Sequence, residues 1–138
     1  MRLVAYVLAM FLLSCTSFAT MSDINLIMSL TSSGPMNGGI RYNVAPNSVI
    51  DVMGSVEKGS DGKSDINLWA DAYIGYWGVA VYYYGATENT NVCGMFAVEQ
   101  PLADKVAIGV GLKLVDFDVM SRVFSVGNGA DAYLVLSL

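Results

Sequence analysis

The stretch Val106 to Leu114, VAIGVGLKL, decides the fold class of this chain. Branched apolar residues stand at every second position, and the positions between them carry only alanine, glycine and one lysine. Successive side chains of a strand point to opposite faces of a sheet, so a period of two indicates a β-strand rather than a helix. The stretch therefore predicts a strand with one oily face and one face of small residues.

The same alternation recurs over residues 65–76 and 77–85. Apolar runs bounded by turn residues add strands near 23–31, 39–45, 48–57, 91–99 and 130–138. We predict an all-β fold, a single antiparallel up-and-down β-barrel of about eight strands. Residues 119–126 leave open a further strand, which would upset a closed arrangement of this kind.

The composition indicates which medium the oily face meets. The chain is 54% hydrophobic and only 14% charged, whereas soluble domains carry about 25% charged residues. The second face of the strands holds glycine, alanine, tyrosine and isolated charges instead of the lysine, glutamate and threonine that a water-facing sheet carries. We expect the oily face to meet lipid and the second face to fill a narrow barrel, whose eight strands leave room only for side chains.

The isolated charged residues stand at the alternate strand positions that belong to the second face. This placement predicts that opposite charges pair across the lumen. The predicted lumen charge network consists of Arg41, Asp51, Glu57, Asp71 and Lys113. An unpaired charge in that place would cost several kcal/mol. The alternative is that these residues are ordinary surface charges of a soluble sheet.

Several function classes fit the sequence poorly. The formal charge is -5 without a clustered basic patch, which argues against nucleic acid as a partner. The chain has no histidine, so it lacks the commonest general base and metal ligand. Asp116 and Asp118 form a tempting catalytic pair, but a solvated turn is the preferred interpretation. We expect no enzyme activity, no catalytic or metal site and no cofactor.

The N-terminus has the form of a secretory signal. Arg2 precedes the apolar run LVAYVLAMFLL from Leu3 to Leu13, and Ser17-Phe18-Ala19 supplies small residues for cleavage. We predict a signal peptide over 1–19 and a barrel domain over 20–138. The segment Leu12 to Cys15 also resembles a bacterial lipobox, which leaves lipidation of Cys15 as the less favoured outcome.

Three features resemble the small eight-stranded outer-membrane barrels of Gram-negative bacteria, the class that contains the OmpX and OmpA transmembrane domains. They are the leader, the segment QPLADK at 100–105 running into VAIGVGLKL, and the terminal stretch Asp131 to Leu138. The family usually ends on an aromatic residue, where this chain has Leu138. The resemblance implies export to the outer membrane, assembly by the barrel-assembly machinery and contact with outer-membrane lipid.

Two functions remain open from the sequence. The first is an outer-membrane barrel with transmembrane β-strands and a structural or surface-interaction role, a filled interior and no open pore. Its loops near 31–38, 57–64, 86–91 and 116–129 would meet an extracellular partner. The second is a soluble or lipid-anchored periplasmic barrel that binds an apolar ligand in its lumen.

Overall fold

The computed structural model describes residues 23–30, 38–127 and 129–138, and these residues form nine strands and no helix. The strands are β1 (Ile24–Leu30), β2 (Gly38–Ala45), β3 (Ser48–Lys58), β4 (Ser64–Ile74), β5 (Trp77–Tyr84), β6 (Asn89–Ala103), β7 (Val106–Asp118), β8 (Val123–Val126) and β9 (Ala130–Ser137). No helix in these ranges is long and apolar enough to cross a membrane. The leader predicted over 1–19 and Cys15 lie outside the described residues.

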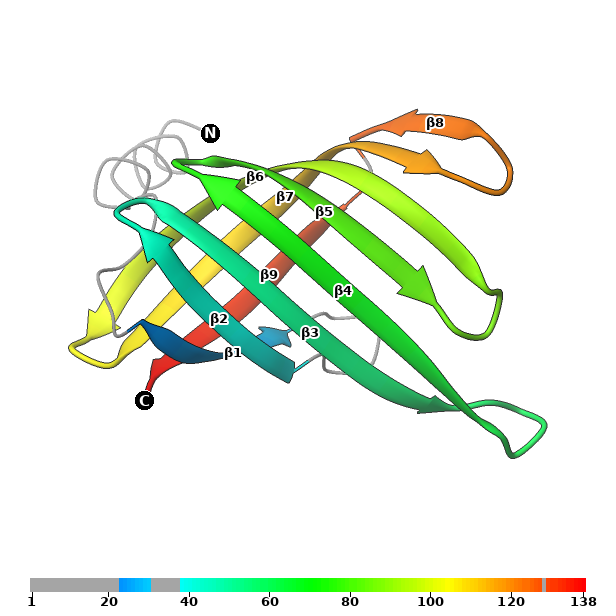
Figure 1. Ribbon diagram of the computed structural model, residues 1–138, viewed down its shortest axis with the longest axis horizontal. Helices are drawn as coiled ribbons and strands as arrows, with labels where there is room; N and C mark the ends of the chain where they lie inside the picture. Colours follow the sequence, from blue (N-terminus) through cyan, green and yellow to red (C-terminus); the bar gives the residue numbers. More distant parts are fainter. Residues whose placement is uncertain (1–22, 31–37, 128) are drawn as a thin grey trace, which may run out of the picture.

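The strands close into one antiparallel barrel (Figure 1). Consecutive strands pair from β1 to β6, β6 pairs with β7, and β7 pairs with β9, which returns to β1. In the described part of the chain this ring has eight strands, since β8 takes no separate place in it. The predicted all-β, antiparallel barrel is therefore confirmed.

The ninth strand extends one side of the barrel without opening it. β7 pairs with β9 through residues 106–112 and with β8 through residues 115–118. β8 and β9 thus follow each other along the same edge of β7, and β8 forms the projecting hairpin in Figure 1. The further strand left open over 119–126 exists at 123–126, and it does not upset closure because it lies beyond the end of β9.

The connections differ in length between the two rims (Figure 1). Two-residue turns join β2 to β3, β4 to β5 and β6 to β7, and they lie on the same side as the C-terminus. Asn47 and Gly75 adopt positive φ angles of 59° and 60° in the first two of these turns. The connections at 59–63, 85–88 and 119–122 lie at the other rim. This asymmetry matches the arrangement of outer-membrane barrels.

The segment at 100–105 lies between the strand predicted near 91–99 and the strand that begins at Val106, and most of it is strand rather than connection in the structure. β6 continues through Pro101 to Ala103, and a register shift lies between these two residues. Proline lacks the N–H that a regular ladder needs, and the irregular pairing accommodates it. β6 is consequently longer than predicted, which moves Glu99 from the end of the strand into its body.

The two faces of the strands carry opposite chemistry, as the alternation predicts. In β7 the residues Ala107, Gly109 and Gly111 are buried, while Val106, Ile108 and Val110 face outward and are partly exposed. The same parity holds in β4 and β5. The outward apolar side chains form the outer belt, which includes Ile24, Leu26, Ile40, Tyr42, Val44, Ile50, Val52, Ile66, Leu68, Val79, Val81 and Leu112.

Candidate functional site

The interior of the barrel holds a buried group of charges around Arg41. Arg41 lies on β2 and is 2% exposed; its Nε and Nη2 donate to Asp51 on β3 at 2.7 Å and 2.8 Å. Its Nη1 donates to Glu99 on β6. The ring order puts β2 and β6 on opposite walls, since four steps separate them in either direction. The guanidinium therefore links two facing walls through the middle of the lumen.

Asp71 adds a third carboxylate to this group. It is the cross-strand neighbour of Asp51, and both side chains point inward. Directly opposed residues of an antiparallel pair have Cβ atoms about 5 Å apart. The interior near Arg41 thus contains three buried carboxylates, Asp51, Asp71 and Glu99, and one guanidinium. We call these four residues the central charge cluster.

Lys113, predicted to pair with carboxylates, lies against aromatic rings. Its Nζ is 4.2 Å from the ring centroid of Tyr82 and 5.9 Å from that of Trp69. The negative face of an aromatic ring attracts a cation in this geometry. The two rings also contact each other, with centroids 4.4 Å apart. Lys113 thus lies against aromatic rings, and it also interacts electrostatically with the carboxylate of Asp131 on β9.

Glu57 does not join the central charge cluster. It lies six positions beyond Asp51 on β3, which is about 20 Å along a strand that rises about 3.3 Å per residue. The side chain is half-buried near the rim, where its cross-strand partner is Asp65. The structure thus brings together Arg41, Asp51 and Asp71 of the predicted network, and distance keeps Glu57 apart.

Glu99 was missed by the sequence analysis. It has the same parity as Cys93, Met95 and Ala97, which are all buried. This alternation places Glu99 on the inner face and could have identified it. The strand was expected to end at residue 99, however, and a side chain at the end of a strand need not be buried in the lumen. The continuation of β6 through Pro101 supplies that reason.

Aromatic rings cover glycines of the neighbouring strand inside the lumen. Gly109 on β7 is paired with Tyr133 on β9, and Gly78 on β5 is paired with Tyr73 on β4. A Cβ at Gly109 would lie 2.2 Å from Cζ of Tyr133, and a Cβ at Gly78 would lie 2.4 Å from Cδ1 of Tyr73. The glycines make room for rings that lie flat against the wall, which explains why the inner face alternates small and large residues.

A second polar group lies near the longer-loop rim. Asn91 Nδ2 donates to both oxygens of Asp116 at 3.0 Å and 3.2 Å, and Cys93 Sγ contacts Asp116 Oδ1 at 3.3 Å. Asn89 Nδ2 donates to Asp118 Oδ2 at 2.7 Å. Asp116 is buried inside β7, so the solvated turn preferred for this pair is wrong for Asp116. Both carboxylates, on β7, therefore accept hydrogen bonds from asparagines of β6.

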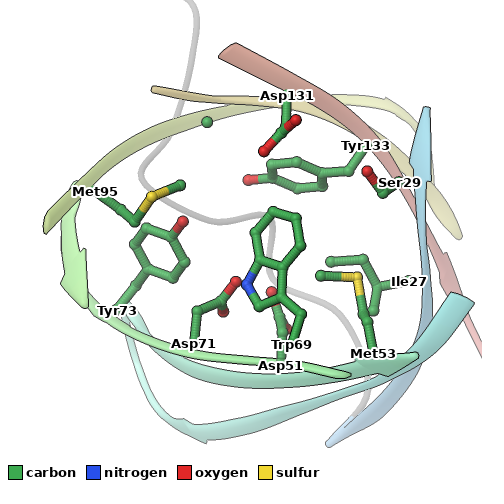
Figure 2. A pocket seen from close by; sticks show the side chains of 11 residues that line it. Ile27, Ser29, Asp51, Met53, Trp69, Asp71, Tyr73, Met95, Asp131 and Tyr133 are labelled. Atoms are coloured by element: carbon green, nitrogen blue, oxygen red, sulfur yellow. The ribbon is translucent and has the colours of Figure 1, made fainter. Parts of the chain in front are cut away.

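A small cavity remains at the centre of the lumen (Figure 2). Its volume is about 10 Å³, which is close to the space one water molecule needs. Trp69 lies in the middle of the view with its Nε1 toward Asp71, and Asp131 and Tyr133 lie on the far wall. Side chains thus occupy nearly all of the interior at this level.

No group of three or more histidine, cysteine, aspartate or glutamate residues in the described ranges is arranged to hold a metal ion. Cys93 is buried and free. Comparisons of the chain with protein-family models, with curated proteins and with solved structures find no match.

Proposed function

We propose that the protein is a small outer-membrane barrel with a structural or surface-interaction role, whose filled interior leaves no open pore. The observation that carries the proposal is the reversed distribution of side chains. Arginine, aspartate, glutamate and asparagine are buried inside, whereas isoleucine, valine and leucine form the exposed outer belt. Soluble monomers rarely expose apolar patches larger than a few hundred Å².

The dimensions of the strands support a membrane setting. β3 and β4 each have 11 residues, and a tilted strand needs about 9–11 residues to cross the hydrocarbon core. The outward residues of β9 continue the apolar alternation through Ala132, Leu134 and Leu136. This alternation is similar to that of the last strand in the small outer-membrane barrels, although those barrels usually end on an aromatic residue and this chain has Leu138.

The interior supports a closed lumen. Arg41 connects opposite walls, and Trp69, Tyr73 and Tyr133 fill the space beside it. Pockets for small apolar ligands have volumes of about 300–1,000 Å³, compared with about 10 Å³ for the central cavity. The alternative of a periplasmic barrel that holds an apolar ligand is therefore the weaker candidate.

The first test is the location and heat stability of the protein. A membrane barrel stays in the membrane fraction after high-salt and carbonate washing. Its unboiled band also migrates differently from the boiled band on a detergent gel. A protein that is released by washing and shows no band shift would favour the periplasmic alternative.

A pair of matched substitutions tests the medium around the outer belt. Val52 lies in the middle of β3 and Val44 lies next to a short turn, and they are 56% and 57% exposed. Val52→Lys is expected to lower the unfolding free energy in lipid vesicles by about 2–4 kcal/mol, and Val44→Lys by about 1 kcal/mol or less. If both changes are neutral, the belt faces water, because surface substitutions cost less than about 0.5 kcal/mol.

A further inference from the structure

The connection between β7 and β8 differs from the other described connections at the longer-loop rim (Figure 1). The connections at 59–63 and 85–88 consist of glycine, alanine, hydroxyl and charged residues. The β7–β8 turn instead begins with Val119 and Met120, and β8 adds Phe124, and all three side chains are exposed. A contiguous exposed apolar patch marks an interaction surface.

The apolar side chains of this hairpin gather on its outward face. Val115 pairs with Val126, and Phe117 pairs with Phe124. Val115 and Phe117 flank Asp116, which is buried on the inner side, so both pairs point outward. The hairpin is therefore a two-stranded ribbon with one apolar face. Its opposite face carries mostly polar residues, namely Asp116, Asp118, Val123 and Ser125.

The outward face of the hairpin continues the outer belt. Val81 on β5 is paired with Val92 on β6, and Val92 is paired with Phe117 on β7. Phe117 is paired in turn with Phe124 on β8. These four side chains point outward and are 38–61% exposed, and directly opposed residues have Cβ atoms about 5 Å apart. One row of apolar side chains thus runs from β5 to β8, so the medium that contacts the belt also reaches Phe124.

The length of β7 gives the level of the hairpin in a bilayer. Phe117 is eleven positions beyond Val106, the first residue of β7. At a rise of about 3.3 Å per residue and a tilt of about 40°, this separation corresponds to about 25–28 Å along the membrane normal. The apolar band of an outer-membrane barrel is about 25 Å tall. If Val106 lies at one boundary of the band, Phe117 and Phe124 lie at the other, and Arg122 in the turn lies among the headgroups.

We propose that the β7–β8 hairpin docks on the lipid bilayer at the boundary between acyl chains and headgroups. Phe117, Phe124 and Val126 lie against the acyl chains, and the exposed guanidinium of Arg122 meets lipid phosphates, which are favourable partners for arginine. The inference rests on the proposed function and deepens it, because it assigns this hairpin to the bilayer rather than to an extracellular partner.

A second copy of the chain fits the hairpin less well than lipid. Stable protein interfaces use about 20–30 residues a side, whereas the outward face of this hairpin offers four apolar residues. Contact with lipid needs no minimum area, because each apolar side chain gains free energy by its own burial.

The test is the quenching of tryptophan fluorescence by brominated lipids. The full chain is reconstituted in phosphatidylcholine vesicles whose acyl chains carry bromine either near the headgroup or near the chain end. Phe124→Trp is made in a Trp77→Phe background, in which Trp69, buried in the lumen, contributes a signal common to all variants. We expect the added tryptophan to lose most of its fluorescence, with stronger quenching by the bromine near the headgroup. Lys63→Trp in the same background, at an exposed polar connection of the same rim, is the control and is expected to keep its fluorescence.

Trp77 separates this inference from the proposed function. Its side chain faces outward and is 63% exposed, so the difference between the wild type and Trp77→Phe reports whether the barrel itself lies in lipid. Quenching of Trp77 without quenching in Phe124→Trp overturns the inference and leaves the proposed function standing, whereas an unquenched Trp77 overturns both. Equal quenching in Lys63→Trp also overturns the inference, because lipid contact would then not be specific to the hairpin. If Phe124→Trp does not fold, Met120→Trp in the turn replaces it, and a signal that the bromine near the headgroup leaves unquenched refutes the docking.

Discussion

Replacing Arg41 by methionine is the sharpest test of how the lumen is held together. Methionine keeps much of the length of the side chain and removes the charge with all its donors. The change leaves Asp51 and Glu99 without the guanidinium that lies between them, and both carboxylates are 1% exposed. The contact between opposite walls of the barrel is lost at the same time.

The expected cost follows from burial. Removing one partner of a buried ion pair destabilises a protein by about 3–5 kcal/mol, because the remaining charge has neither water nor a counter-charge. That cost corresponds to a roughly hundred- to several-thousand-fold increase in the unfolding equilibrium constant. A triple variant, Arg41→Met with Asp51→Asn and Glu99→Gln, removes the guanidinium and the two carboxylates to which it donates. We expect it to recover part of the loss, since replacing buried ion partners together by neutral residues costs little, whereas Asp71 keeps its carboxylate in the lumen.

The assay is urea unfolding in detergent micelles or lipid vesicles. The folded fraction is read from the unboiled band on a gel and from circular dichroism, and the midpoint shift gives the change in stability. Lys105→Met, at the exposed β6–β7 turn, is the control and should change the unfolding free energy by less than about 0.5 kcal/mol. The reasoning fails if Arg41→Met costs less than about 1 kcal/mol, or if the triple variant is no more stable than the single one.

Three further predictions concern other parts of the barrel. Gly109→Ala should destabilise the protein by about 1–3 kcal/mol, because the new Cβ would lie 2.2 Å from the Tyr133 ring. Gly38→Ala is the control and should be nearly neutral in the same urea titration, since a Cβ at Gly38 has open space around it. Cys93 is 1% exposed, so in a variant lacking the other cysteine a maleimide should label it only after unfolding, and rapid labelling of the folded protein would contradict its place in the lumen. Phe124→Ser in β8 should lower the free energy of unfolding by about 1 kcal/mol or less, whereas Tyr133→Ala in β9 should lower it by about 3–5 kcal/mol. Equal losses of stability would mean that β8 belongs to the closed ring.

The alternation along each strand was enough to predict which side chains face inward. Arg41, Asp51, Asp71 and Lys113 all lie in the lumen as their parity requires, because the period of a strand does not depend on its neighbours. The contacts among them could not be predicted in this way. A contact depends on the register between strands, and the turn and any bulge set that register.

The β2–β3 hairpin shows why the contacts need the structure. Its two-residue turn pairs Ala45 with Ser48, and a regular ladder from that pair would place Arg41 opposite Val52. The observed register shifts by one residue between Asn43 and Ala45, and Arg41 then lies opposite Asp51. Nothing in the local sequence marks this bulge. Pairing with β7 also determines whether β8 forms and how long β6 is. The sequence alone therefore left the strand within 119–126 undecided and placed the end of β6 near residue 99, several residues too early.

The bulge suggests what the buried charges contribute. A buried ion group is weak support for stability, because desolvation offsets much of the attraction. Its geometry is nevertheless demanding, since Arg41 meets both oxygens of Asp51 only in the shifted register. A slip by one residue would turn either Arg41 or Asp51 toward the outer belt, where a charge in hydrocarbon costs several kcal/mol. A slip by two residues would keep the apolar side chains outward, so the outer belt by itself does not distinguish registers that differ by two. The contacts of Arg41 with Asp51 therefore favour the observed register of β2 on β3, and we expect the triple variant to be less uniform in the pairing of these two strands.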